Sequence, residues 1–101
     1  MIGLPMLVAI AIHTHSDGRL HACAPDFSGC AVSGALEEIV LPTLRLQVED
    51  EITARLLNKA ALPETRNGDP PRGAGQPGVR WANIHINLGH LVALAKTQQR
   101  A

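Results

Sequence analysis

Two stretches of this chain have residue patterns that are typical of strands, one a run of apolar residues rich in β-branched side chains and the other an alternation of apolar and polar positions. In Met6–Thr14 one face carries the branched aliphatic residues Val8, Ile10 and Ile12. The opposite face carries Leu7, Ala9, Ala11 and His13. We expect the branched face to receive a helix and the alanine-rich face to meet another subunit or a partner. Trp81–Leu88 alternates polar residues such as Asn83 and His85 with apolar residues such as Ile84, and predicts a further strand with one buried face.

A hairpin follows the first strand, because Ser-Asp-Gly at residues 16–18 is a turn signal between two apolar stretches. Arg19–Ala24 is then the second strand, antiparallel to the first. A two-residue turn would place Ile12 opposite Cys23, whereas a three-residue bulged turn would shift the register by one residue. The sequence leaves both registers open.

Residues Ala35–Ala61 show the three-and-four spacing of an amphipathic helix. Its apolar positions are Leu36, Ile39, Val40, Leu44, Val48, Ile52 and Leu56. Glu37 and Glu38 fall in the first turn, where the helix dipole favours negative charge. Pro42 predicts either a kink or a fresh helix start with the proline in the first turn.

The remaining segments complete the predicted order of elements. Cys30–Val32 predicts a short third strand, and His90–Gln99 predicts a short terminal helix. Glu64–Arg80 is rich in glycine and proline and lacks apolar periodicity, so we expect a flexible loop over residues 64–80. The predicted class is α+β, a small curled antiparallel sheet with one long helix packed on it. The order is β-β-β-α-β plus a short C-terminal helix, in a single domain spanning residues 1–101.

The hexapeptide PDFSGC at residues 25–30 is the most distinctive motif of the chain. Its proline fixes φ, its aspartate can bond its own backbone two residues on, and its glycine permits conformations that a Cβ forbids. Gly34 then ends the third strand, and Glu37 and Glu38 open the helix. The motif predicts a strand–turn–strand–helix junction. It fits either a purely structural turn or a turn beside a partner-binding surface.

This combination resembles the P-D-hydrophobic-P-G-C … G-x-T-x-E-E-A signature of HicB-like antitoxins. The resemblance covers Met6–Pro63 and, less closely, Trp81–Leu88. Ser28 stands where the family has its second proline, and the usual threonine before Leu36 is missing. The family's truncated ribonuclease H-like domain has the same element order, so the resemblance implies a partial ribonuclease H-like fold.

HicB-like proteins bind and neutralise HicA toxins, which are small basic ribonucleases, and they commonly form dimers or tetramers. The resemblance therefore implies an antitoxin-like chain that binds a HicA-like toxin or another small basic protein and forms a homo-oligomer. Many family members also carry a C-terminal DNA-binding module. Thirteen residues follow Leu88, so we expect a HicB-like domain without that module.

Composition bears on the partner and on the compartment. The 101 residues are 46% hydrophobic but include only one tryptophan and one phenylalanine, so we expect a thin aliphatic core of the kind that oligomerisation often stabilises. Residues 1–34, 35–62 and 63–101 carry net charges of −1, −2 and +3, and no basic patch supports direct binding of nucleic acid. The apolar segment Leu4–Ile12 is too short for a membrane span. Two cysteines without a secretory leader indicate the cytoplasm.

Histidine and cysteine residues on the strands offer a possible metal site, since zinc favours these ligands. The weak candidates are His13, His15, His21 and His85. No C-x-x-C or H-E-x-x-H motif supports them, so half-exposed polar positions are the preferred interpretation. Cys30 lacks a helix N-terminus directly after it and is interpreted as a buried hydrophobe rather than a nucleophile. A disulfide between Cys23 and Cys30 is not expected in the cytosol.

Enzymatic chemistry is not expected of this chain. A two-metal nuclease site of the ribonuclease H type needs several carboxylates converging on the sheet. The first, second and fourth predicted strands carry no carboxylate, and Asp17 and Asp26 lie in turns. We therefore expect no catalytic residue, no cofactor and no metal.

The resulting hypothesis is a non-catalytic protein-interaction module, in which charge steers a basic partner and apolar contact holds it. The candidate binding residues are Ala9, Ala11, His13, Asp26, Phe27, Glu49, Asp50 and Glu51. The acidic run at residues 49–51 equally fits a solvated helix face. Two alternatives remain, an orphan self-associating structural domain and a small metal-binding protein that uses the strand histidines.

Overall fold

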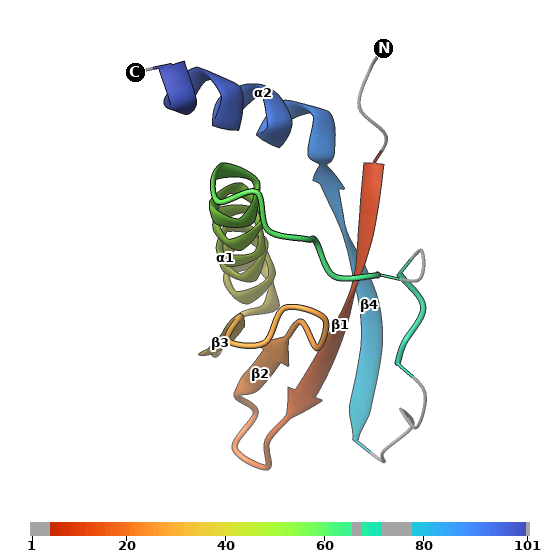
Figure 1. The fold of residues 1–101 in the computed structure, drawn as a ribbon. Coiled ribbons are helices and arrows are strands. Elements are labelled where there is room, and N and C mark those ends of the chain that lie inside the picture. Colours follow the sequence, from red (N-terminus) through yellow and green to blue (C-terminus); the bar gives the residue numbers. More distant parts are fainter. Residues whose placement is uncertain (1–4, 66–67, 72–77, 101) are drawn as a thin grey trace.

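The computed structural model describes residues 5–65, 68–71 and 78–100, and it contains four strands and two helices in that part of the chain (Figure 1). The elements are β1 (Pro5–Thr14), β2 (Leu20–Cys23), β3 (Ala31–Gly34), α1 (Glu37–Leu57), β4 (Val79–Asn87) and α2 (Leu88–Arg100). The predicted α+β class and the order β-β-β-α-β with a C-terminal helix are therefore confirmed. No helix within these ranges is long and apolar enough to cross a membrane.

The four strands form one antiparallel sheet in the order β3-β2-β1-β4, and α1 lies against one of its faces (Figure 1). We call this face the inner face and the opposite one the outer face. Val8, Ile10 and Ile12 point to the inner face and are at most 1% exposed. The predicted facing of the first strand is thus confirmed, because the branched side chains do receive the helix.

The hairpin between β1 and β2 has the bulged register. His13 lies opposite His21, and the N–H of His15 donates to the carbonyl oxygen of Arg19 at 2.8 Å, which leaves three residues in the turn. Gly18 closes the turn at φ +86°, in the left-handed region that glycine enters without a Cβ clash. This register places the apolar Ala22 opposite Ile12, so that both contribute to the inner face.

Helix α1 runs from Glu37 through Pro42 to Leu57, so of the two expected alternatives, a kink or a fresh start at the proline, the fresh start is wrong. Its buried residues are Val40, Leu44, Val48 and Ile52, which recur at every fourth position. Two residues predicted for the buried stripe point elsewhere, since Leu36 is 50% exposed and Ile39 is 60% exposed. The helix is therefore rotated so that one apolar side of its first half faces solvent.

The segment after α1 crosses the outer face of the sheet before it reaches β4 (Figure 1). The backbone of Gly68 lies close to the side chains of Leu7 and Asn83 on that face. Ala9 is fully buried there, so the prediction that it lies on a surface open to a partner is wrong. Much of the predicted loop, residues 66–67 and 72–77, lies outside the described residues, while Val79 and Arg80 belong to β4.

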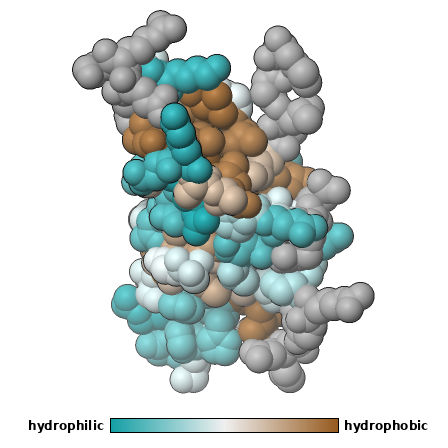
Figure 2. Space-filling model, viewed as in Figure 1, coloured by the Kyte–Doolittle hydropathy of each residue, from teal (hydrophilic) through white to brown (hydrophobic). Residues whose placement is uncertain are grey.

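Helix α2 begins directly after β4 and packs across the C-terminal half of α1 through Leu91 and Ala95, which are both 4% exposed. Figure 2 shows the consequence on one face of the molecule. Apolar residues gather below α2, and hydrophilic residues cover the end with the β1–β2 hairpin. The predicted terminal helix is confirmed, with two residues more at its start.

Candidate functional site

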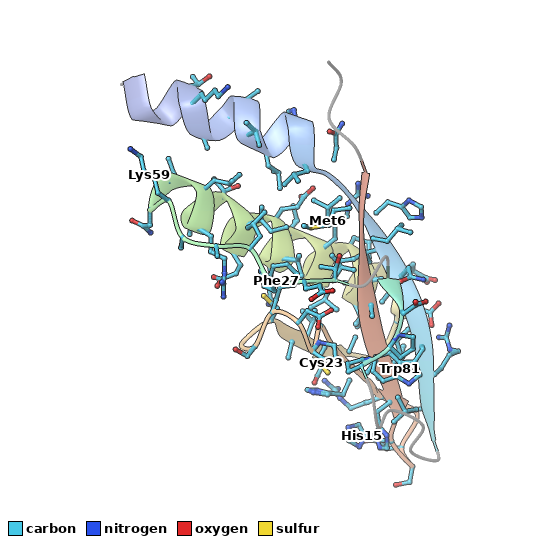
Figure 3. All side chains as sticks on the ribbon, turned by 45° about the vertical axis from the view of Figure 1, so that its right-hand side comes forward. Met6, His15, Cys23, Phe27, Lys59 and Trp81 are labelled. Atoms are coloured by element: carbon cyan, nitrogen blue, oxygen red, sulfur yellow. The ribbon has the colours of Figure 1, made fainter. Side chains whose placement is uncertain are left out.

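The PDFSGC turn joins β2 to β3 through its own backbone. The N–H of Phe27 donates to the carbonyl oxygen of Ala24 at 2.9 Å, and the N–H of Cys30 donates to that of Phe27 at 3.0 Å. This winding directs the phenyl ring of Phe27 beneath α1, where it is 0% exposed (Figure 3). Phe27 is therefore a core residue, and its prediction as a surface contact is wrong.

The turn and the acidic part of α1 meet at the surface. The N–H of Ala31 donates to the side-chain oxygen of Gln47 at 3.0 Å, which fixes the turn against the helix. Beside this bond lies an open cavity of about 350 Å³. We call it the turn–helix hollow, and its lining residues are Ser28, Gly29, Cys30, Gln47, Asp50 and Glu51. The structure thus brings together two groups that the sequence predicts separately, the turn and the acidic run.

The charge at this hollow is negative. Helix α1 carries five carboxylates against two guanidinium groups, which leaves it a net charge of −3. Glu51 is paired with Arg55 at 3.1 Å and Glu49 with Arg45 at 3.8 Å, both at i,i+4 spacing. Asp50 is exposed between them on the rim of the hollow. Since each paired surface carboxylate is largely neutralised by its arginine, Asp50 contributes most of the negative electrostatic potential at the rim of the hollow.

Cys30 lines the hollow but is 93% buried, with 7% of its surface exposed. Burial raises the pKa of its thiol above the ordinary value of 9.0, and the nearby Glu51 carboxylate adds to the rise while Arg55 opposes it. The thiol is therefore protonated at neutral pH, which agrees with its interpretation as a buried hydrophobe. Cys23 is also a free thiol, and it lies on the outer face of the sheet, away from Cys30.

Three of the four candidate metal ligands come together at the hairpin end of the outer face. The rings of His13 and His15 lie 4.9 Å apart, and those of His15 and His21 lie 6.5 Å apart. His21 also shares a hydrogen bond of 2.8 Å with the hydroxyl of Ser33. His85 lies opposite Leu7, several residues from this group. Among the described residues, no three His, Cys, Asp or Glu side chains are placed to hold a metal ion.

The other predicted contacts are dispersed. His13 is exposed at the hairpin end, Ala11 is half-buried on the outer face, and Asp26 is half-buried in the turn. Sequence reasoning missed a second apolar surface on α1, where Leu46 is 61% exposed beside Ile39. The seven-residue spacing of these two, outside the every-fourth-residue series of the core, is the signal that could have revealed it.

No protein-family model matches the sequence, and no curated protein matches it significantly. Among solved structures, the fold is similar to the N-terminal domain of the Burkholderia pseudomallei antitoxin HicB, with a TM-score of 0.61. The alignment covers 80% of this chain and 98% of that domain, at 17% sequence identity. The chain therefore has the α+β fold of a HicB N-terminal domain.

Proposed function

We propose that this protein is a non-catalytic, antitoxin-like interaction module that binds a small basic protein, such as a HicA-type ribonuclease, and masks it. The observation that carries the proposal is the acidic turn–helix hollow on a HicB-type fold. A basic side chain of the partner enters the hollow and meets Asp50 on its rim. The charge favours a protein over RNA as the partner, since an acidic surface repels RNA and attracts a basic protein that cleaves RNA.

The absence of catalysis is part of this proposal. Strands β1 to β4, as the structure bounds them, carry no aspartate or glutamate, so the sheet offers no carboxylates to bind two catalytic metal ions. The thiol of Cys30 is held in its protonated form by burial and is a poor nucleophile. These features support an inhibitor that blocks a partner by covering it.

The proposal also includes self-association in the cytoplasm. The core is built from aliphatic side chains around a single phenylalanine, and small cores of this kind often gain stability from a second copy. Two free cysteines are compatible with a reducing compartment.

The test is to purify the tagged chain from its native host and to identify what co-purifies by mass spectrometry and light scattering. We expect a small basic protein in a fixed molar ratio, whose RNA cleavage stops when the chain is added in equal amount. A homo-oligomer without such a protein, or a co-purified protein whose ribonuclease activity the chain leaves unchanged, would overturn the proposal.

A charge-reversal variant tests the role of the hollow in that complex. Asp50→Lys should weaken the association about tenfold at low salt, and the loss should shrink at high salt because ions screen exposed charges. Asp69→Lys makes the same change at an exposed position on the segment that crosses the outer face, and it should leave affinity within twofold. Equal effects of the two variants would show that net charge, and not the hollow, attracts the partner.

A further inference from the structure

An apolar surface of α1 lies next to the turn–helix hollow and is not covered by any described part of the chain. Leu36 is 50% exposed, Ile39 is 60% exposed and Leu46 is 61% exposed. Between them, the hydroxyl of Thr43 donates to the carbonyl oxygen of Ile39 at 2.7 Å, so this polar group is satisfied within the helix. We call these four residues the α1 stripe. Ile39, Thr43 and Leu46 recur at four- and three-residue intervals and lie along one side of α1, and Leu36, the residue before the helix, lines the same cavity as Ile39.

A second cavity lies at the N-terminal end of the α1 stripe. It has a volume of about 160 Å³ and is lined by Val32, Gly34, Leu36, Ile39 and Val40, among others. Its lining is mainly aliphatic, and its size suits one aliphatic side chain. Gly34 keeps β3 close to the helix here, because a Cβ at this position would come within 2.9 Å of the Val40 side chain. We call this cavity the anchor hollow.

Acidic groups flank the stripe at both ends. Glu38 is exposed in the first turn of α1, and Asp50 follows Leu46 by one helical turn. A second copy packed on this stripe would bring two α1 helices together, each of which carries a net charge of −3. The two like-charged helices would repel each other, which disfavours a second copy as the occupant.

We infer that the α1 stripe is a docking groove for an amphipathic helix with a flank of lysine or arginine residues, supplied by the basic partner. The helix places apolar side chains on Ile39 and Leu46, one of them in the anchor hollow, and its basic flank pairs with Glu38 and Asp50. This deepens the proposed function, on which it rests, by naming the surface and the element of the partner that bind. Apolar contact then supplies the affinity, and charge selects the partner.

The experiment uses a defined probe, a fluorescein-labelled 14-residue peptide of leucine and lysine in amphipathic order, titrated with the full chain by fluorescence anisotropy. Two matched peptides replace all leucines by glutamine or all lysines by glutamate. The chain variant Ile39→Gln/Leu46→Gln changes the stripe at two exposed sites, so we expect it to leave folding intact. Its matched control is Leu94→Gln, which removes an apolar residue that is 41% exposed on α2.

We expect the leucine–lysine peptide to bind the natural chain at least tenfold more tightly than either matched peptide, because burial and charge both contribute. The double variant should lose at least tenfold in affinity, and Leu94→Gln should lose less than twofold. Equal affinity for the double variant and the control would overturn the inference. So would a stripe-dependent dimer in light scattering, since the stripe would then be occupied by a second copy.

The outcome is separable from that of the proposed function. The native host could yield a ribonuclease that the chain inhibits and that binds the double variant as tightly as the natural chain. This result would support the antitoxin-like role and contradict the docking groove. If the peptide binds through the stripe but the chain inhibits no ribonuclease, the docking groove is supported, and its natural partner belongs to another class of basic protein.

Discussion

Phe27 is the bulkiest of the fully buried side chains, and it belongs to a turn rather than to a strand or helix. The local hydrogen bonds of the turn direct the phenyl ring under α1. A six-residue turn has no repeating pattern of apolar residues from which this direction could be predicted. Ile39 shows the opposite case, since it fits the apolar spacing of α1 and yet is exposed. Sequence patterns define which residues are apolar, but the direction of a turn and the rotation of a helix depend on long-range packing.

Replacing Phe27 by alanine should therefore destabilise the fold as strongly as a core deletion. We expect the free energy of unfolding, measured by urea denaturation, to fall by about 3–5 kcal/mol. Ser28→Ala changes the neighbouring exposed residue and should alter it by less than about 0.5 kcal/mol. A loss below about 1 kcal/mol for Phe27→Ala would mean that the ring is not an anchor of the turn.

Cys30 should make stability depend on pH in the alkaline range. Burial raises its folded-state pKa above 9.0, so the folded chain holds the thiol proton more tightly than the unfolded chain. The contribution is present below pH 9 and is lost as the pH rises through the folded-state value, because the unfolded thiol ionises first. Chemical denaturation between pH 7 and pH 10.5 should show a steeper loss for the natural chain than for Cys30→Ala. Parallel curves would contradict the assigned burial effect.

The secondary-structure elements followed well from the sequence, and their junctions did not. All four strands and both helices lie within a few residues of their predicted ranges, because alternation and three-and-four spacing persist through each of them. The hairpin register was left open, since an Asp-Gly pair suits turns of two or three residues. The three-residue bulged turn places the apolar Leu20 and Ala22 on the inner face, opposite Thr14 and Ile12. The burial of these two side chains therefore favours this register over that of a two-residue turn.

Pro42 is tolerated inside α1 at a cost in stability. It is the sixth residue of the helix, so it lacks an N–H that would otherwise donate to the carbonyl of Glu38. Because the ring is exposed and Leu41 and Arg45 line the neighbouring groove, Pro42→Ala should restore the hydrogen bond without opening a core cavity. We expect the free energy of unfolding to rise by about 1–3 kcal/mol, while Thr43→Ala at the next position should change it by under about 1 kcal/mol. A less stable Pro42→Ala variant would show that the ring contributes packing that outweighs the lost bond.

The arrangement of the whole chain assigns different roles to the two faces of the sheet. The inner face is filled by α1, and the outer face is crossed by the segment that leads from α1 to β4 (Figure 1). Gly68 on this crossing lies against Leu7 and Asn83, and Ala9, which pairs with Asn83, is fully buried, so this part of the outer face is not the open apolar surface that the sequence predicted. A connection rich in glycine and proline lacks the periodicity that would predict where it packs, and this is why our proposal places the partner on α1 and the turn instead of the outer face.

The crossing depends on Gly68. A Cβ on this residue would lie 2.1 Å from the side-chain oxygen of Asn83 and 3.0 Å from Cβ of Leu7, and its φ is +82°. Gly78 has a similar φ of +80°, but the nearest atom to its Cβ position, in His13, is 3.9 Å away. Gly68→Ala and Gly78→Ala therefore carry the same backbone strain, and only the first adds a steric clash with the outer face.

We expect Gly68→Ala to lower the free energy of unfolding by at least about 1 kcal/mol more than Gly78→Ala does. Because the clash displaces the crossing segment rather than the core, hydrogen exchange should accelerate at the backbone of residues 60–65 and 68–71, while the amides of β1 and α1 stay protected. Limited proteolysis should cut Gly68→Ala in the same range. If both variants lose equal stability and show equal exchange, the crossing does not pack on the outer face, and Ala9 and Leu7 return to the surface that a partner can contact.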